Sequence, residues 1–230
     1  NIKQDDRCSI DNFKWYLDMA KILIEATTYK KPYDELTTLQ QVFCDCDLAI
    51  FKETEEANQK FEDAIFDEYQ FVDLGDYIKG RETVLHKLYE LDYLKNMPWF
   101  NISYFKHKQY RIGLYIGSFN PWHIGHEYVL NKAEELFDKV IIGVGANEKD
   151  KLDLNNLPHK NQKIKFDVLT KYLDTLNYKV TIIRGLRNAT DLIYEQNYAE
   201  TINDIRPLQN FVYLNTKQEY SKIKESIKNE

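Results

Sequence analysis

The chain has 230 residues, of which 43% are hydrophobic and 14% aromatic, so it holds enough apolar material for a packed core and is not a wholly disordered protein. Its formal net charge of −6 lies entirely in the first half, because residues 1–111 hold 21 acidic and 15 basic side chains and the remainder holds 16 of each. An acidic first half argues against nucleic acid as a partner, since binding a phosphate backbone needs a basic face.

The first part of the chain predicts helices. Apolar side chains recur at helical spacing in four stretches, 13–28, 36–51, 53–69 and 78–93, and the first of these has the pattern of a buried helix. Pro98 and the aromatic residues up to Tyr104 end this rhythm. We therefore expect an all-helical domain over residues 1–108 and a second domain over residues 109–230.

All three cysteines, Cys8, Cys44 and Cys46, lie in the helical part. Cys44 and Cys46 are separated by one residue, which is too tight for a zinc knuckle, and no other Cys or His pair completes a metal site. An odd number of cysteines, without a signal peptide or an apolar membrane-spanning run, favours a cytoplasmic protein with no membrane association.

From about Tyr110 the pattern changes to an alternation of strands and helices. Apolar runs at 111–116, 140–144, 180–183 and 211–214 alternate with helical stretches at 127–137, 163–176 and 191–205, and a polar helix is expected at the end. This alternation predicts an α/β domain, a Rossmann-like parallel sheet with right-handed crossovers. Ligands of such sheets bind at the carboxyl ends of the strands.

The loop after the first predicted strand reads G-S-F-N-P-W-H-I-G-H over residues 117–126. Gly117 allows a sharp turn and a close approach to a ligand, and Gly125 leaves room for a nucleotide. His123 and His126 are three residues apart, near the first turn of a helix, and therefore share one face. The free N–H groups of that turn make it an anion site.

A second motif, R-G-L-R-N-A-T-D-L-I-Y-E, occupies residues 184–195. Arg184 and Arg187 flank a glycine after a strand, and the planar guanidinium group suits phosphate oxygens. Asp191 lies in the first turn of the next helix, where the dipole favours an acid. Taken alone, this motif also fits a structural cap beside two surface arginines.

Together the two motifs resemble the nucleotidyltransferase superfamily, and the R-G-L-R-x-x-x-D-x-x-Y-E string resembles the phosphopantetheine adenylyltransferase family over about residues 111–226. The resemblance implies that His126 is catalytic with His123 beside it, and that Arg184 binds the acceptor. The family's lysine that grips the acceptor phosphate aligns with Asp150, and the flanking Lys149 and Lys151 are therefore the candidates for this substrate-binding role. The nucleotide-binding residues that the resemblance implies are Gly117, Ser118, Phe119, Gly125, Arg187, Asp191 and Glu195.

The implied reaction transfers AMP from ATP, accompanied by Mg²⁺, to 4′-phosphopantetheine, giving dephospho-CoA and pyrophosphate. The implied partners are therefore ATP and a phosphorylated small-molecule acceptor, and the family's habit implies a homo-oligomer. A strand and helix that the family has before the position of Arg184 are expected to be missing, and the family's serine-rich ATP loop is altered at 220–226. Two alternatives follow: another phosphate acceptor such as nicotinamide mononucleotide, or a nucleotide-binding regulatory protein with a non-catalytic helical half.

The helical half faintly resembles the later part of HD-type metal-dependent phosphohydrolases, through residues 45–51 and 71–85. In that resemblance Asp45 or Asp47 would be a metal-binding aspartate. No His-Asp dipeptide occurs in the chain, and no histidine precedes His86, so the ligand set is incomplete. A packing or oligomerisation module is the favoured interpretation, and a second, phosphatase activity is the alternative.

Overall fold

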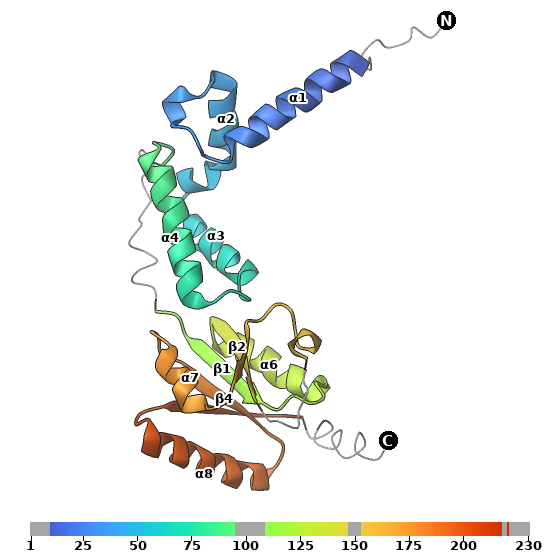
Figure 1. Ribbon diagram of the computed structural model, residues 1–230, viewed down its shortest axis with the longest axis vertical. Helices are drawn as coiled ribbons and strands as arrows, with labels where there is room; N and C mark the ends of the chain where they lie inside the picture. Colours follow the sequence, from blue (N-terminus) through green and yellow to red (C-terminus); the bar gives the residue numbers. More distant parts are fainter. Residues whose placement is uncertain (1–9, 95–108, 147–152, 218–219, 221–230) are drawn as a thin grey trace, which may run out of the picture. The chain divides into compact units, whose positions relative to one another are not determined.

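Figure 1 shows the computed structural model, which describes residues 10–94, 109–146, 153–217 and 220. The described residues fall into two compact units, one of residues 10–67 with 77–94 and the other of residues 68–76 with the described residues from 109 onward. The first unit is helical and the second holds the sheet. Within the described ranges, no helix is both long and apolar enough to cross a membrane.

The helical part contains α1 (Ile10–Ala26), α2 (Thr38–Asp47), α3 (Glu55–Glu68) and α4 (Leu74–Glu90), with 3-10 turns η2 (Tyr33–Glu35) and η3 (Ala49–Lys52). Helix α2 begins with a capping box, in which Thr37 and Gln40 satisfy each other's backbone N–H groups. Its length differs from the prediction, because the expected helix over 36–51 divides into α2 and η3. Around the fully buried Cys44, the core of this unit is formed by Ala26, Leu36, Leu48, Phe51, Leu85, Leu88, Tyr93 and Leu94.

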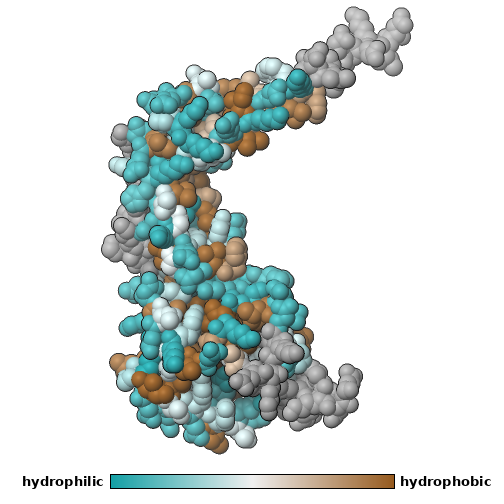
Figure 2. Space-filling model, in the orientation of Figure 1, coloured by the Kyte–Doolittle hydropathy of each residue, from teal (hydrophilic) through white to brown (hydrophobic). Residues whose placement is uncertain are grey.

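Helix α1 is far more exposed than its sequence predicts. Figure 2 shows apolar side chains on its surface, and Phe13, Trp15 and Ile24 are 65%, 57% and 62% exposed. Over residues 13–26 only Ala26 is buried. The prediction of a buried helix is therefore wrong for most of α1, because apolar periodicity reports which face can be buried but not whether another element covers it.

The second unit is built on one parallel sheet with the strand order β3-β2-β1-β4-β5. The order steps outward in both directions from β1, so the crossovers place α6 (Ile124–Leu136) on one face and α7 (Leu169–Thr175) and α8 (Ala189–Ile205) on the other (Figure 1). The predicted Rossmann-like fold is confirmed. The strands are β1 (Ile112–Gly117), β2 (Lys139–Gly145), β3 (Lys163–Phe166), β4 (Thr181–Leu186) and β5 (Asn210–Asn215).

Strands β1 and β2 are buried almost throughout, as strands covered by helices on both faces must be. Their side chains form the core together with α6, and Val129 and Ala133 of that helix have no exposed surface. This packing holds the start of α6 firmly against the ends of the central strands. The candidate site residues near that start therefore lie next to the buried core.

Two predictions fail between β2 and β4. Residues 163–166, expected to open a helix, form the edge strand β3, and the helix α7 begins only at Leu169. A strand and a helix thus do precede β4, although the described part of the β2–β3 crossover contains only the 3-10 turn η4 (Leu154–Asn156). Lysines on a four-residue edge strand hide its period-2 pattern, and such charges are typical of edges. The polar terminal helix expected after residue 214 lies outside the described residues, apart from Tyr220.

The short segment Glu68–Asp76, from the last residue of α3 to the first turn of α4, belongs to the sheet unit. Lys139 at the start of β2 is 1% exposed, and its Nζ donates to the carbonyl oxygens of Gln70 and Val72, the latter at 2.7 Å. Asp73 accepts from the hydroxyl of Tyr178 at 3.1 Å. The boundary predicted between residues 108 and 109 is therefore incomplete. It would assign Lys139 and its hydrogen-bond partners in Glu68–Asp76 to different domains.

Burial lowers the pKa of Lys139 from 10.5 to about 8, against the opposing charge of Asp73. Between these two values the unfolded chain binds more protons than the folded chain, so the free energy of unfolding rises with pH. We predict that wild-type stability increases by up to about 1.4 kcal/mol per pH unit, relative to Lys139→Met, from about pH 8 to 9.5. Urea unfolding of both chains across that range measures the difference.

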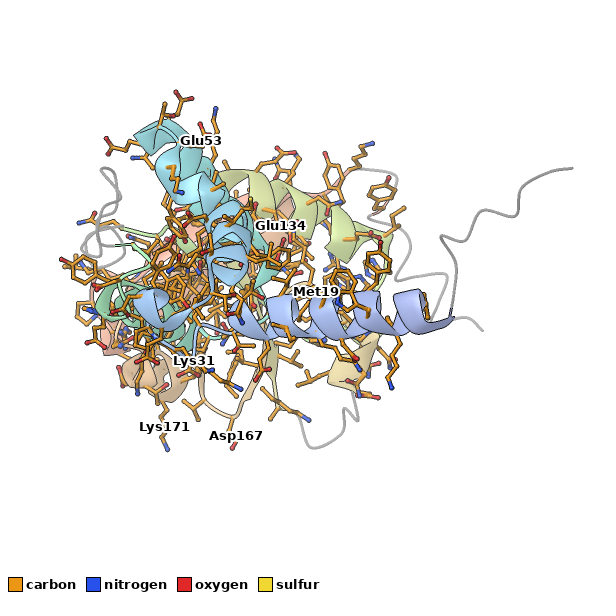
Figure 3. All side chains as sticks on the ribbon, turned by 90° about the horizontal axis from the view of Figure 1, so that it is seen from above. Met19, Lys31, Glu53, Glu134, Asp167 and Lys171 are labelled. Atoms are coloured by element: carbon orange, nitrogen blue, oxygen red, sulfur yellow. The ribbon has the colours of Figure 1, made fainter. Side chains whose placement is uncertain are left out.

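The matched control is Lys171→Met, which removes an exposed lysine of the same unit (labelled in Figure 3). Its stability should follow the wild type across the pH range, because that ammonium group stands in solvent. Parallel pH profiles for the wild type and Lys139→Met would contradict the proposed titration.

Candidate functional site

A cavity of about 260 Å³ opens at the carboxyl ends of β1 and β4. These strands are neighbours in the sheet, and the chain leaves them toward opposite faces, so the cavity lies at the topological switch point where ligands of such sheets bind. Both sequence motifs contribute to it. Its lining consists of Tyr115, Ile116, Gly117, Ser118, Phe119, His123, Gly125, His126, Arg184, Gly185, Arg187, Asp191, Tyr194, Glu195, Thr216 and Tyr220.

The loop after β1 is anchored by Phe119, which is 1% exposed and packs edge-to-face on Tyr115 with ring centroids 4.9 Å apart. Phe119 has a φ of 47°, whereas no glycine in the described residues has a positive φ. The expectation that Gly117 makes the sharp turn is therefore wrong. Gly117 is required for another reason, since a Cβ there would lie 2.9 Å from the Phe119 ring.

His123 caps the N-terminus of α6. Its Nδ1 accepts a hydrogen bond from the backbone N–H of Gly125 at 3.1 Å, so the imidazole carries its proton on Nε2. A Cβ at Gly125 would lie 2.9 Å from His123 Cε1, and the glycine therefore makes room for the cap as well as for a ligand. The cap leaves His123 Nε2–H as the hydrogen-bond donor that its ring can offer.

His126, in the first turn of α6, stacks on His123 with ring centroids 3.8 Å apart and an angle of 23° between the rings. Phe119 meets it edge-on at 5.2 Å, and Trp122 lies tilted at 5.5 Å. Three rings thus restrict the rotation of the His126 side chain at the edge of the cavity. The first-turn N–H groups of α6 add partial positive charge beside it.

Arg184 on β4 is held in one orientation by Glu195 of α8. Its Nε and Nη2 donate to the two carboxylate oxygens at 2.6 Å each, and Nη1 donates to the carbonyl of Ile116 at 2.8 Å. The guanidinium also lies 5.4 Å from the centre of the Tyr198 ring. Glu195 is 7% exposed, so this bidentate ion pair is well shielded from solvent and rigid.

Arg187 makes a similar pair with Asp191 at the start of α8. Its backbone N–H and Nε donate to one carboxylate oxygen at 3.0 and 2.8 Å, and Nη2 donates to the other at 3.1 Å. Asn188 caps α8 by accepting from the backbone N–H of Asp191 at 2.9 Å. Asp191 is thus both a structural residue at the start of α8 and part of the cavity wall. The sequence left open whether this motif is a structural cap or a phosphate-binding turn, and the two roles occur together.

Ten of the twelve predicted site residues line this one cavity. The other two, Lys149 and Lys151, lie outside the described residues. The sequence analysis did not identify Tyr115, Tyr194, Thr216 or Tyr220 as lining residues. Thr216 follows β5, and its backbone N–H donates to the carbonyl of Leu186 at 2.8 Å. The pairing of β4 with β5 brings Thr216 to the cavity, and the sequence alone did not predict which strands pair.

The two aspartates of the helical half are engaged by tyrosines. The hydroxyl of Tyr33 donates to Asp45 at 3.1 Å, and that of Tyr29 donates to Asp47. Burial, together with the neighbouring carboxylate, raises the pKa of Tyr29, which keeps this hydroxyl a donor. In the parts of the chain that the structure describes, no group of three His, Cys, Asp or Glu side chains is arranged to hold a metal ion.

Comparisons with known proteins agree with this geometry. Residues 114–227 match the family model described as cytidylyltransferase-like. The chain is 29% identical to a phosphopantetheine adenylyltransferase of Vesicomyosocius okutanii over 51% of this chain and 82% of the relative. The enzymes of the same name from Streptococcus pneumoniae and Streptococcus suis are 31% and 34% identical, over 50% and 47% of this chain and 80% and 75% of the relatives.

The family model covers most of the sheet unit, including both motifs. The helical half lies outside the family model. Through its C-terminal half, the chain therefore belongs to the cytidylyltransferase-like nucleotidyltransferases and, within them, to the phosphopantetheine adenylyltransferase family.

Proposed function

We propose that the protein transfers AMP from ATP to 4′-phosphopantetheine, producing dephospho-CoA and pyrophosphate. The observation that carries the proposal is the meeting of the histidine loop and the R-G-L-R turn in one cavity at the switch point of the sheet. The names of the relatives support the choice of acceptor, and the matching family model spans both motifs. The helical half takes no part in this chemistry.

In the proposed reaction a phosphate oxygen of the acceptor forms a bond to the α-phosphorus of ATP, and the bond from that phosphorus to the pyrophosphate oxygen breaks. The attacking phosphate is already ionised, so no general base is required. Catalysis then rests on positioning and on stabilising the charge of the transition state. His126 and the N–H groups at the start of α6 act on the α-phosphate, while Arg187 binds the departing pyrophosphate and Arg184 the acceptor.

We further propose that Mg²⁺ arrives with ATP as part of that substrate. Mg²⁺ bound to nucleotides is held largely by phosphate oxygens and water, with few protein ligands. The two carboxylates of the cavity wall, Asp191 and Glu195, both accept hydrogen bonds from arginines, which fits a metal carried by the nucleotide. The ion would reduce the negative charge on the phosphates, and the protein residues would orient them.

The decisive experiment is pyrophosphate release from Mg-ATP with a panel of acceptors. Release with 4′-phosphopantetheine alone would support the proposal. Release only with another acceptor, such as nicotinamide mononucleotide, would keep the fold and chemistry but replace the substrate. Binding of ATP without release for any acceptor would contradict the proposed activity and favour a regulatory role.

The substitution His126→Ala should lower kcat by about 10²–10³-fold, the usual effect of removing one donor that stabilises transition-state charge. The Kd for ATP should change by less than about threefold, because the ground-state nucleotide keeps its other contacts. Steady-state kinetics and equilibrium binding give the two quantities. His159→Ala, at an exposed histidine that does not line the cavity, is the control. Equal losses in kcat and ATP binding would contradict the assignment.

Glu195 should act through Arg184 and not as an independent ligand. Arg184→Ala and Glu195→Ala should each lower kcat/KM for the acceptor by about 10- to 100-fold. The kcat/KM of the double variant should be no lower than that of the less active single variant. A double-mutant cycle of kcat/KM measures this coupling. Losses that simply multiply would show that the two side chains act independently.

A further inference from the structure

Tyr115 is a buried tyrosine whose hydroxyl opens into the cavity. Its side chain is 3% exposed, and it contributes to the cavity lining. Among the described residues its hydroxyl forms no hydrogen bond, and it is not one of the fully enclosed polar atoms, so the surface that it keeps faces the cavity. A buried tyrosine hydroxyl usually has a hydrogen-bond partner. The hydrogen-bonding capacity of this hydroxyl is therefore directed at a ligand.

The ring of Tyr115 is fixed by the residues that hold the histidine loop. Its centroid lies 4.9 Å from that of Phe119 and 6.5 Å from that of Trp122, both in edge-to-face contacts. Tyr115 and Phe119 belong to the buried cluster that also contains Val129 of α6. Because packed rings in a core keep one rotamer, the hydroxyl at the tip of this ring is held at a defined place.

The strand register shows on which side of the sheet this hydroxyl lies. Tyr115 pairs with Ile183, so Tyr115 faces the same side as Gly185, two residues further along β4. A Cβ built on Gly185 would lie 3.7 Å from the Tyr115 hydroxyl oxygen and 3.2 Å from Val129 of α6. The hydroxyl therefore lies on the α6 side of the sheet, where β1 and β4 end. The missing side chain of Gly185 keeps the space beside it open.

Arg184 points to the opposite side of the sheet, because successive side chains of a strand alternate. There its guanidinium group is bound by Glu195 of α8. The cavity thus has an α8 side with this ion pair and an α6 side with His126 and the Tyr115 hydroxyl. In the proposed function the acceptor binds to Arg184 and the α-phosphate to the start of α6. The Tyr115 hydroxyl is on the side of the α-phosphate.

The electrostatic surroundings make this hydroxyl a donor to an anion. Burial raises the pKa of Tyr115 far above the ordinary value for tyrosine, against the opposing positive charge of Arg184, so the hydroxyl keeps its proton. Arg184 and the N-terminus of α6 both contribute positive potential, which favours a negatively charged partner. A hydrogen bond to an anionic oxygen is also stronger than one between neutral groups. These surroundings fit a phosphate oxygen better than a sugar hydroxyl.

We propose that the Tyr115 hydroxyl donates a hydrogen bond to a non-bridging oxygen of the α-phosphate of ATP. The proposal rests on the proposed adenylyltransferase function and deepens it, because it adds a donor from the sheet to His126 and the N–H groups of α6. Negative charge on the transferring group is stabilised by donors that are already in place. Tyr115 keeps its proton throughout, and no covalent bond to it forms or breaks.

The test compares Tyr115→Phe with Tyr172→Phe in the full chain. Tyr115→Phe removes one oxygen atom and keeps the ring that packs on Phe119. Tyr172 is the matched control, because burial also raises its pKa and its ring stacks on Phe166, whereas it does not line the cavity. Equilibrium binding is measured with Mg-ATP, AMP and adenosine, and the last two differ only in the α-phosphate. Thermal unfolding checks that both variants are folded.

Tyr115→Phe should raise the Kd for AMP and for Mg-ATP by about tenfold, the usual size of a lost hydrogen bond to a charged group. The Kd for adenosine should stay within about twofold of the wild type, because adenosine has no phosphate for the hydroxyl to bind. In pyrophosphate release, kcat should fall by at least about tenfold. Tyr172→Phe should match the wild type in all of these measurements.

Equal weakening of AMP and adenosine binding by Tyr115→Phe would overturn the proposal, because it would place the hydroxyl at the sugar or the base. Unchanged AMP binding would also overturn it. The proposed acceptor fails separately: if 4′-phosphopantetheine supports no pyrophosphate release, the comparison of AMP with adenosine still decides the role of Tyr115.

Discussion

The pairing of β1 with β4 is the constraint on which the site depends. Tyr115 and Ile183 are partners in this parallel ladder although 68 residues separate them in the chain, and the loop after Gly117 therefore meets the turn after Arg184. Neither loop could make the cavity alone, because the histidine loop supplies no guanidinium group and the arginine turn supplies no imidazole. Parallel pairing places both strand ends at one edge of the sheet, and the change of crossover direction leaves space between them.

Ion pairing within the cavity wall changes how its arginines act. A guanidinium already bound to a carboxylate is oriented before a ligand arrives, so less side-chain entropy is lost on binding. The same pairing removes net charge, and the phosphates must then be stabilised by other groups. For the proposed reaction, the N-terminus of α6 and the loop N–H groups therefore become more important than the two arginines of the motif suggest. The paired arginines therefore orient the ligand, whereas other groups supply the positive charge that it needs.

Much of the fold was predictable because its signals are local. The apolar runs of β1 and β2, the helical periodicity of α8 and the spacing of His123 and His126 identified the Rossmann-like unit and most of its cavity. Strand β3 was missed because lysines obscure its short pattern, and the place of Glu68–Asp76 was missed because no local signal marks a partner 69 residues away. Apolar spacing in α1 likewise predicted burial that only packing can decide.

The sequence by itself determined the chemistry that the site can offer: two imidazoles at a helix start, two arginines after a strand, and carboxylates one helical turn apart. Only the tertiary structure decided how these groups are used. It showed that Phe119 and not Gly117 carries the unusual backbone angle, that His123 is a cap, and that each arginine faces a carboxylate. The reason is physical: residue type fixes donors, acceptors and charge, whereas hydrogen-bond partners depend on which distant segments the sheet brings together.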